Sequence, residues 1–174
     1  MEQRCRLEGV FFLQGTSDEH LSLLEHLSPV HDRLSSVIVT TPQAVALMDT
    51  MKSLSFTRAV KLPVLGIVEN MSGYVCPCCG EISNVFSTGG GEEMARREGV
   101  PFLGALPVDT ELVSLLDAAE IVPKELPEAE PHGFRLARRY QETPSGKLFR
   151  KVLDALLDTL LATERRVSSN STVS

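Results

Sequence analysis

The sequence has little positive charge. It carries 17 Lys and Arg residues against 23 Asp and Glu residues, which gives a formal net charge of −6 and a pI near 5.2. This balance argues against a nucleic acid or an anionic membrane as a partner held by bulk electrostatics. The chain also lacks an apolar run near the roughly 20 residues that a membrane span needs. Its first residues include Arg4 and Arg6, but the apolar stretch after them is short and no small-residue cleavage site follows, so we expect no signal peptide.

Cysteine is scarce as well. The chain has four cysteines, and three of them lie between positions 76 and 79. Such crowding is not the spacing of a secreted disulfide framework. We therefore expect a reducing, intracellular compartment.

A complete phosphate-binding loop is missing from the sequence. No G-x-x-x-x-G-K-[S/T] pattern occurs, and the nearest candidate, Gly146-Lys147, is followed by Leu148 and has Gln141 where the first glycine should stand. The backbone amides and the lysine of that motif are what cradle nucleotide phosphates. The sequence therefore lacks this means of holding nucleotide phosphates.

The sequence contains enough apolar residues to form the hydrophobic core of one domain. It has 174 residues, of which 43% are hydrophobic. Short apolar runs predict buried strands, and segments with apolar residues three and four positions apart predict helices between them. The strands are expected at 8–13, 36–41, 63–68 and 100–106, and the helices at 21–27, 44–54, 91–99, 111–120 and 147–162. This alternation predicts an α/β fold with a doubly wound parallel sheet.

Two segments differ in composition from the rest of the predicted domain, which spans 1–163. Residues 119–146 are rich in proline and mixed charge, so we expect an irregular insertion with one helical turn around 134–140. Residues 164–174 have no apolar face, and we expect a disordered tail.

Polar side chains follow several of the predicted strands. These strand ends are Gly15–Asp18, Thr40-Thr41, Glu69-Asn70 and Pro107–Asp109. In a doubly wound sheet, functional residues gather beyond the carboxyl ends of the strands. We therefore expect one site edge there, with Asp109 or Thr110 also capping the following helix.

The cysteine loop is the main candidate site. Cys76 and Cys79 form a C-x-x-C pair, and a short turn at this spacing can aim both sulfurs at one soft metal ion or one iron of a cluster. A tetrahedral sulfur site needs four ligands, so a second copy of the chain is the simplest source of the missing pair. A zinc knuckle and a plain reduced loop remain open. A thioredoxin-like role is disfavoured because no helix follows the motif to lower a thiol pKa.

Cys78 and the glycines after the cysteine loop are expected to have structural roles and not to bind a ligand. Cys78 lies inside the pair and is expected to be a bystander. The glycines Gly89–Gly91 could form a phosphate nest, but we favour an entry loop into the next helix.

Five segments carry a resemblance to a known family. They are GTSDEHLSLLEHL, VIVTTPQAVAL, VLGIVENMSGYVCPCC, FSTGGGEEMA and GVPFLGALPVD, in the family's order, and the resemblance runs from about Gly15 to Ala118. Together they resemble the Mrp-type P-loop ATPases that scaffold iron–sulfur clusters. Residues 143–157 also resemble the closing helix of that family.

The resemblance implies a cytosolic scaffold that assembles a [4Fe–4S] cluster and passes it to apoproteins. It implies a homodimer, or a heterodimer with a related scaffold ATPase, in which Cys76 and Cys79 of two subunits hold a bridging cluster. It also implies ATP and Mg²⁺ as cofactors. Asn70 would contact the adenine, and Pro107 and Asp109 would line the base pocket.

The chain departs from the family in its phosphate-binding elements. The family's D-T-P-P-G-T-S-D segment is reduced to GTSD, because Phe12, Leu13 and Gln14 precede Gly15. We therefore expect the C-terminal portion of a P-loop NTPase fold, incomplete at the N-terminus, from a truncated, alternatively spliced or misassembled gene product. Two alternatives to cluster transfer remain. One is a zinc-bound dimerising module, and the other is an ATPase that is active only with a complete partner.

Overall fold

The computed structural model describes residues 17–76, 78–83, 88–121 and 132–170. The chain divides into two compact units, Met1–Leu34 and Ser35–Ser174. In the first unit, the described residues form helix α1 (Ser17–His26) and the 3₁₀ helix η1 (Ser28–Arg33), which confirms a helix after Gly15. The strand predicted at 8–13 lies outside the described residues.

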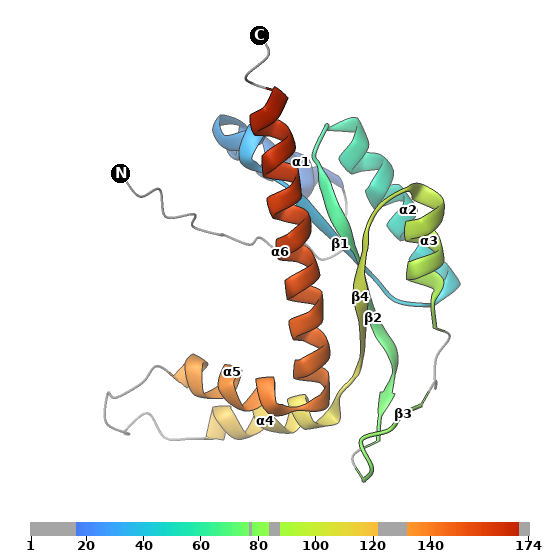
Figure 1. Ribbon diagram of the computed structural model, residues 1–174, viewed down its shortest axis with the longest axis vertical. Coiled ribbons are helices and arrows are strands. Elements are labelled where there is room, and N and C mark those ends of the chain that lie inside the picture. Colours follow the sequence, from blue (N-terminus) through green and yellow to red (C-terminus); the bar gives the residue numbers. More distant parts are fainter. Residues whose placement is uncertain (1–16, 77, 84–87, 122–131, 171–174) are drawn as a thin grey trace. The chain divides into compact units, whose positions relative to one another are not determined.

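The second unit is built on a sheet with β2 (Val64–Val75) at its centre. Strand β1 (Ser36–Thr40) and strand β4 (Phe102–Val108) each pair with β2 in parallel, and β3 (Ile82–Ser83) pairs antiparallel with its last residues. The three parallel strands coincide with the apolar runs at 36–41, 63–68 and 100–106, so the positions of those strands are confirmed (Figure 1). The expected burial of β1 is wrong for one of its faces. Val37 and Val39 are 37% and 54% exposed, and among the described strands β1 is an edge strand that pairs with β2 alone.

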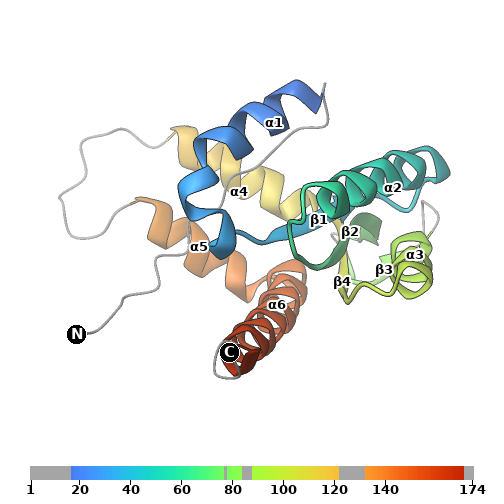
Figure 2. The same cartoon turned by 90° about the horizontal axis from the view of Figure 1, so that it is seen from above.

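Helices cover both faces of this sheet. Helix α2 (Ala44–Ala59) and helix α3 (Gly90–Glu98) lie against one face, and helix α6 (Pro144–Asn170) lies against the other (Figure 2). The side chains of β2 alternate between the faces, so Ile67 and Val68 enter different clusters. The fold is therefore α/β and doubly wound, as predicted.

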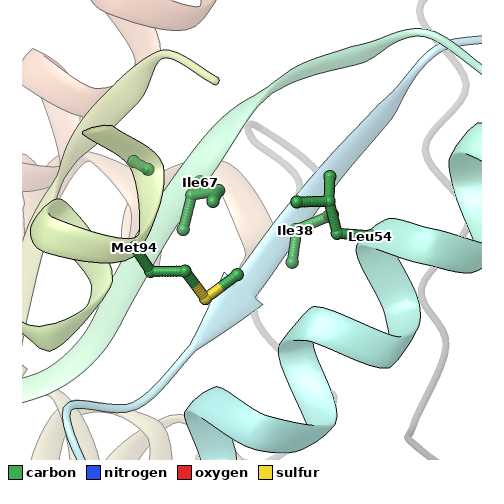
Figure 3. Close-up of a cluster of buried hydrophobic side chains, with 5 residues drawn as sticks. Ile38, Leu54, Ile67 and Met94 are labelled. Carbon is green, nitrogen blue, oxygen red and sulfur yellow. The ribbon is translucent and has the colours of Figure 1, made fainter. Parts of the chain in front are cut away.

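Each face has its own apolar cluster. On the α2 and α3 face the buried members are Ile38, Leu54, Ile67, Met94 and Ala95 (Figure 3). On the α6 face they are Val68, Leu103 and Val152. These two clusters hold the helices on the strands that end at the predicted site.

Strand β2 is longer than the sequence indicated. We expected it to end at Glu69-Asn70, whereas it continues to Val75. Between these points Met71 and Gly73 have φ angles of 58° and 92°, and the pairing with β4 shifts register. Backbone of positive φ makes a local irregularity that bends a strand without ending it. The strand therefore reaches the cysteines directly.

The region expected to be irregular, 119–146, is largely helical where it is described. Helix α4 (Thr110–Ile121) extends into it, and helix α5 (His132–Glu142) occupies its second half. Helix α5 starts just after Pro131 and ends before Pro144, so the prolines bound the helix instead of excluding it. Residues 122–131 lie outside the described residues.

Helix α6 also runs further than we expected, because it continues through Asn170 instead of ending near 163. Residues 164–170 contain no proline or glycine, and an established helix extends at low cost through such a sequence. None of the helices in the described ranges has the length and hydropathy needed to cross a bilayer.

Candidate functional site

The cysteine pair lies in the turn between β2 and β3. Cys76 follows the last residue of β2, and its backbone N–H donates to the carbonyl of Glu81 at 2.9 Å. The N–H of Gly80 donates back to the carbonyl of Cys76 at 2.8 Å, and Gly80 has a φ of 71°, which glycine adopts without strain. Figure 1 shows β2 and β3 forming a hairpin at the lower end of the sheet. The closed turn leaves Cys79 exposed and Cys76 half-buried.

The backbone of this turn favours the thiolate form of Cys76. The N–H groups of Cys78 and Cys79 hydrogen-bond to its sulfur, and these contacts lower the pKa of the Cys76 thiol below its usual value. Hydrogen bonds from the neighbouring thiols add to the effect, and burial opposes it. The thiolate is the form of cysteine that binds metals, and the ligand role of Cys76 stays a prediction.

The described residues supply no third ligand beside this pair. Within 17–76, 78–83, 88–121 and 132–170, no group of three or more His, Cys, Asp or Glu residues could hold a metal ion. Cys78 is exposed, as Cys79 is, and its expected role as a bystander stays a prediction. For a four-sulfur site, ligands must come from outside the described part of one chain.

A buried carboxylate that the sequence did not reveal lies at the foot of this hairpin. Glu69 is only 1% exposed, and its Oε1 accepts hydrogen bonds from Ser72 Oγ at 2.6 Å and from the N–H of Gly89 at 3.1 Å. Its Oε2 accepts from the N–H of Gly91 at 2.6 Å. The glycine amides at the start of α3 therefore bind a carboxylate of the protein itself, and the interpretation as a helix-entry loop is confirmed.

Asn70 lies within β2 and Pro107 lies near the end of β4, on neighbouring parallel strands. The strands pair Asn70 with Leu106, the residue before Pro107. Asn70 is exposed, and its side-chain oxygen accepts a hydrogen bond from the N–H of Met71 at 3.0 Å. The structure thus brings together two of the residues predicted to line an adenine pocket. Their role in nucleotide binding stays a prediction.

Asp109 is engaged by the fold itself. Its Oδ1 accepts from the N–H groups of Glu111 and Leu112 at 2.8 and 3.3 Å, which confirms the predicted cap of α4. Its Oδ2 accepts a short hydrogen bond from Ser145 Oγ in the first turn of α6. One carboxylate therefore joins the starts of two helices, and an anion is favoured at both helix N-termini.

Replacing Asp109 by Ala is expected to lower the free energy of unfolding by about 1–2 kcal/mol, the usual cost of removing an N-cap. Urea unfolding followed by circular dichroism would measure it. Ser145→Ala is the matched control, because it removes the α6 contact and leaves the α4 cap. Equal losses for the two variants would show that the cap contributes nothing of its own.

The sequence profile of one family matches most of this chain. The family is described as "ParA: NUBPL iron-transfer P-loop NTPase", and the match covers residues 14–138. This range includes the cysteine hairpin, the buried Glu69 and the strand-end residues.

Curated relatives resemble the chain closely. It is 49% identical over 135 residues to the cytosolic Fe-S cluster assembly factor NUBP2 of Bos taurus, covering 76% of this chain and 49% of the relative. It is 55% identical over 106 residues to the cytosolic Fe-S cluster assembly factor CFD1 of Mycosarcoma maydis, covering 61% of this chain and 29% of the relative. The chain thus spans about half the length, or less, of these two relatives.

A solved structure is also similar. It is a nucleotide-binding protein from Archaeoglobus fulgidus in complex with ADP, at 33% identity and a TM-score of 0.49, and the alignment covers 67% of this chain and 44% of that one. The extent of the profile match, residues 14–138, establishes the family. The chain belongs to the NUBPL-type iron-transfer P-loop NTPases.

Proposed function

We propose that this chain is a cytosolic iron–sulfur cluster assembly scaffold. In this proposal Cys76 and Cys79 of two subunits bind one bridging [4Fe–4S] cluster, which then passes to apoproteins. The partner is a second copy of the chain or a related scaffold ATPase. The names of the relatives, cytosolic Fe-S cluster assembly factors, support the assembly role and the compartment.

The observation that carries the proposal is the geometry of the cysteine turn. Two thiols lie at the exposed end of a hairpin whose backbone is closed by hydrogen bonds at 2.8 and 2.9 Å, and backbone amides favour the thiolate of Cys76. A [4Fe–4S] cluster is held by four cysteine thiolates. Two such hairpins related by a two-fold axis would supply all four. An exposed turn is also accessible to an acceptor protein.

We propose only a limited role for nucleotide binding in this chain. Asn70, Pro107 and Asp109 would line the base side of a nucleotide site near the carboxyl end of β4, where Asn70 of β2 pairs with Leu106. The sequence has no G-x-x-x-x-G-K-[S/T] motif to hold the phosphates of ATP·Mg²⁺. We therefore propose that nucleotide binding is impaired in this chain, and that hydrolysis would need a complete partner subunit.

Native mass spectrometry after anaerobic reconstitution with iron and sulfide tests the cluster proposal. The expected result is a dimer heavier by the mass of one four-iron, four-sulfur cluster. A colourless dimer with about one zinc ion per dimer would contradict it and support a zinc-bound dimerising module. A cluster-free monomer would also contradict it, because the cysteines of one chain would then have no partner.

A further inference from the structure

We propose that Glu69 is a positioning residue for the cysteine pair, because it ties together the two ends of the loop that carries Cys76 and Cys79. This inference rests on the proposed function, since it assumes that the pair ligates iron. Glu69 itself contacts neither cysteine. It acts through the backbone of the loop.

One carboxylate oxygen joins the two ends of the loop. Ser72 precedes the cysteines and Gly89 follows them, and both donate hydrogen bonds to Glu69 Oε1, at 2.6 and 3.1 Å. A residue of β2 just before the cysteines and the residue that caps α3 after them are therefore held at a single oxygen atom. A loop whose ends are held together has fewer conformations open to it than a loop whose ends are free.

The other oxygen fixes this junction to the core. Glu69 Oε2 accepts from the N–H of Gly91 at 2.6 Å, within the first turn of α3. Three residues further along α3, Met94 is 4% exposed and packs in the cluster with Ile67. The loop ends are thus attached to a packed helix, and the carboxylate gains from the positive end of that helix.

The surrounding residues leave room for a carboxylate at this point. A Cβ atom added to Gly91 would lie 3.0 Å from Thr40 Cγ2 and 3.1 Å from Glu69 Oε2. Glycine at this position therefore allows the close approach of Glu69 to the α3 amides. No buried side-chain polar atom in the described residues lacks a hydrogen-bond partner, so this buried carboxylate is fully satisfied as it stands.

All three groups that contact the Glu69 carboxylate donate hydrogen bonds to it, so both of its oxygens must act as acceptors. In a Glu69→Gln variant, the amide nitrogen cannot accept a hydrogen bond. Either Gly89 or Gly91 then loses its acceptor, whichever way the amide is turned. The variant preserves size and removes the tie, which makes it a sharper test than truncation to Ala.

The test compares three variants of the full chain. Glu69→Gln breaks the tie, and Ser72→Ala removes only the bond at one end of the loop and leaves both glycine contacts. Ile67→Val lies on the same strand and loosens the core beside α3 without touching the loop, so it serves as the control for lost stability.

Two readouts are needed. The first is hydrogen exchange of the metal-free protein at residues 72–76 and 78–83. We expect faster exchange there in Glu69→Gln, a smaller change in Ser72→Ala, and unchanged exchange in β1. The second is cluster retention against an iron chelator after anaerobic reconstitution. We expect the chelator concentration that strips half of the iron to fall by about 10–100-fold in Glu69→Gln, the usual effect of losing a group that orients a ligand.

The outcomes separate this inference from the proposed function. If the wild-type chain takes up no cluster, the proposed function fails, while hydrogen exchange still reports whether Glu69 holds the loop. If Glu69→Gln leaves both loop exchange and cluster retention unchanged, the positioning role is overturned. It is equally overturned if Ile67→Val weakens cluster retention as much as Glu69→Gln does, because general loss of stability then accounts for the effect.

Discussion

Cys76→Ala and Cys79→Ala are each expected to abolish stable cluster binding, while Cys78→Ala keeps it. In a dimer with one bridging cluster, either single substitution removes two of the four sulfur ligands at once. A [4Fe–4S] cluster does not survive on two thiolates in water, since two of its irons would be open to solvent and chelators. The expected loss is therefore complete instead of graded.

The measurement is iron and acid-labile sulfide per dimer after anaerobic reconstitution, with native mass to identify the oligomer. Cys78→Ala is the matched control because Cys78 lies in the same turn, is exposed as Cys79 is, and stands between the two residues of the C-x-x-C pair. Circular dichroism checks that each variant is folded. Equal iron loss in all three variants would mean that the turn as a whole, and not the C-x-x-C pair, determines binding.

A lesser effect of Cys76→Ala is expected on the turn itself. The backbone N–H groups of Cys78 and Cys79 hydrogen-bond to its sulfur, and these amides lose their acceptor in the variant. The two backbone hydrogen bonds between Cys76 and residues 80 and 81 do not involve the side chain. The hairpin should therefore persist without the cluster, which makes the fold and the ligand role separable.

The parallel strands could be predicted because their sequences strongly favour a β-strand over a helix or a loop. Residues 36–41 and 63–68 are short runs rich in β-branched and apolar side chains, which favours strands of a parallel sheet. Burial on both faces does not hold for β1, where Val37 and Val39 are exposed. Parallel pairing then places the ends of β2 and β4 at one edge. A shared site edge was therefore predictable, but the adjacency of Asn70 and Pro107 depends on β2 pairing with β4, which the pattern of strands does not specify.

The continuation of β2 could not be predicted in the same way. Met71 has a positive φ, which is uncommon for a residue other than glycine, and nothing in its own sequence signals it. Ser72, the next residue, donates a hydrogen bond to Glu69, and Glu69 in turn accepts from the amides of Gly89 and Gly91, which lie 20 and 22 positions away. Local pattern favours a turn at Glu69-Asn70, whereas the sheet carries the chain on to Cys76.

The carboxylates of Asp109 and Glu69 also show that contacts between near neighbours in sequence can be predicted, whereas distant ones cannot. Asp109 was predictable as a cap because its partners, Glu111 and Leu112, are its near neighbours in sequence. Its bond to Ser145 crosses 36 positions and depends on how α6 packs. Glu69 binds residues 20 and 22 positions away, at glycines that the sequence marks only as an entry loop. A glutamate that directly follows a buried strand, before a glycine-rich helix start, is the signal that could have identified it.

Replacing Leu54 by Ala is expected to lower the free energy of unfolding by about 2–5 kcal/mol, the range for a buried leucine that leaves a cavity. Leu54 is 1% exposed and packs from α2 against Ile38 and the α3 residues of the same cluster (Figure 3). Met48→Ala is the matched control, because Met48 is on the same helix but 66% exposed, and its loss should stay within about 0.5 kcal/mol. Urea unfolding of both variants decides the point. Similar losses of unfolding free energy in Leu54→Ala and Met48→Ala would show that α2 is not packed on the sheet in solution. The result also bears on the cysteine loop, because α3, which shares this core, carries the Gly91 amide that binds Glu69.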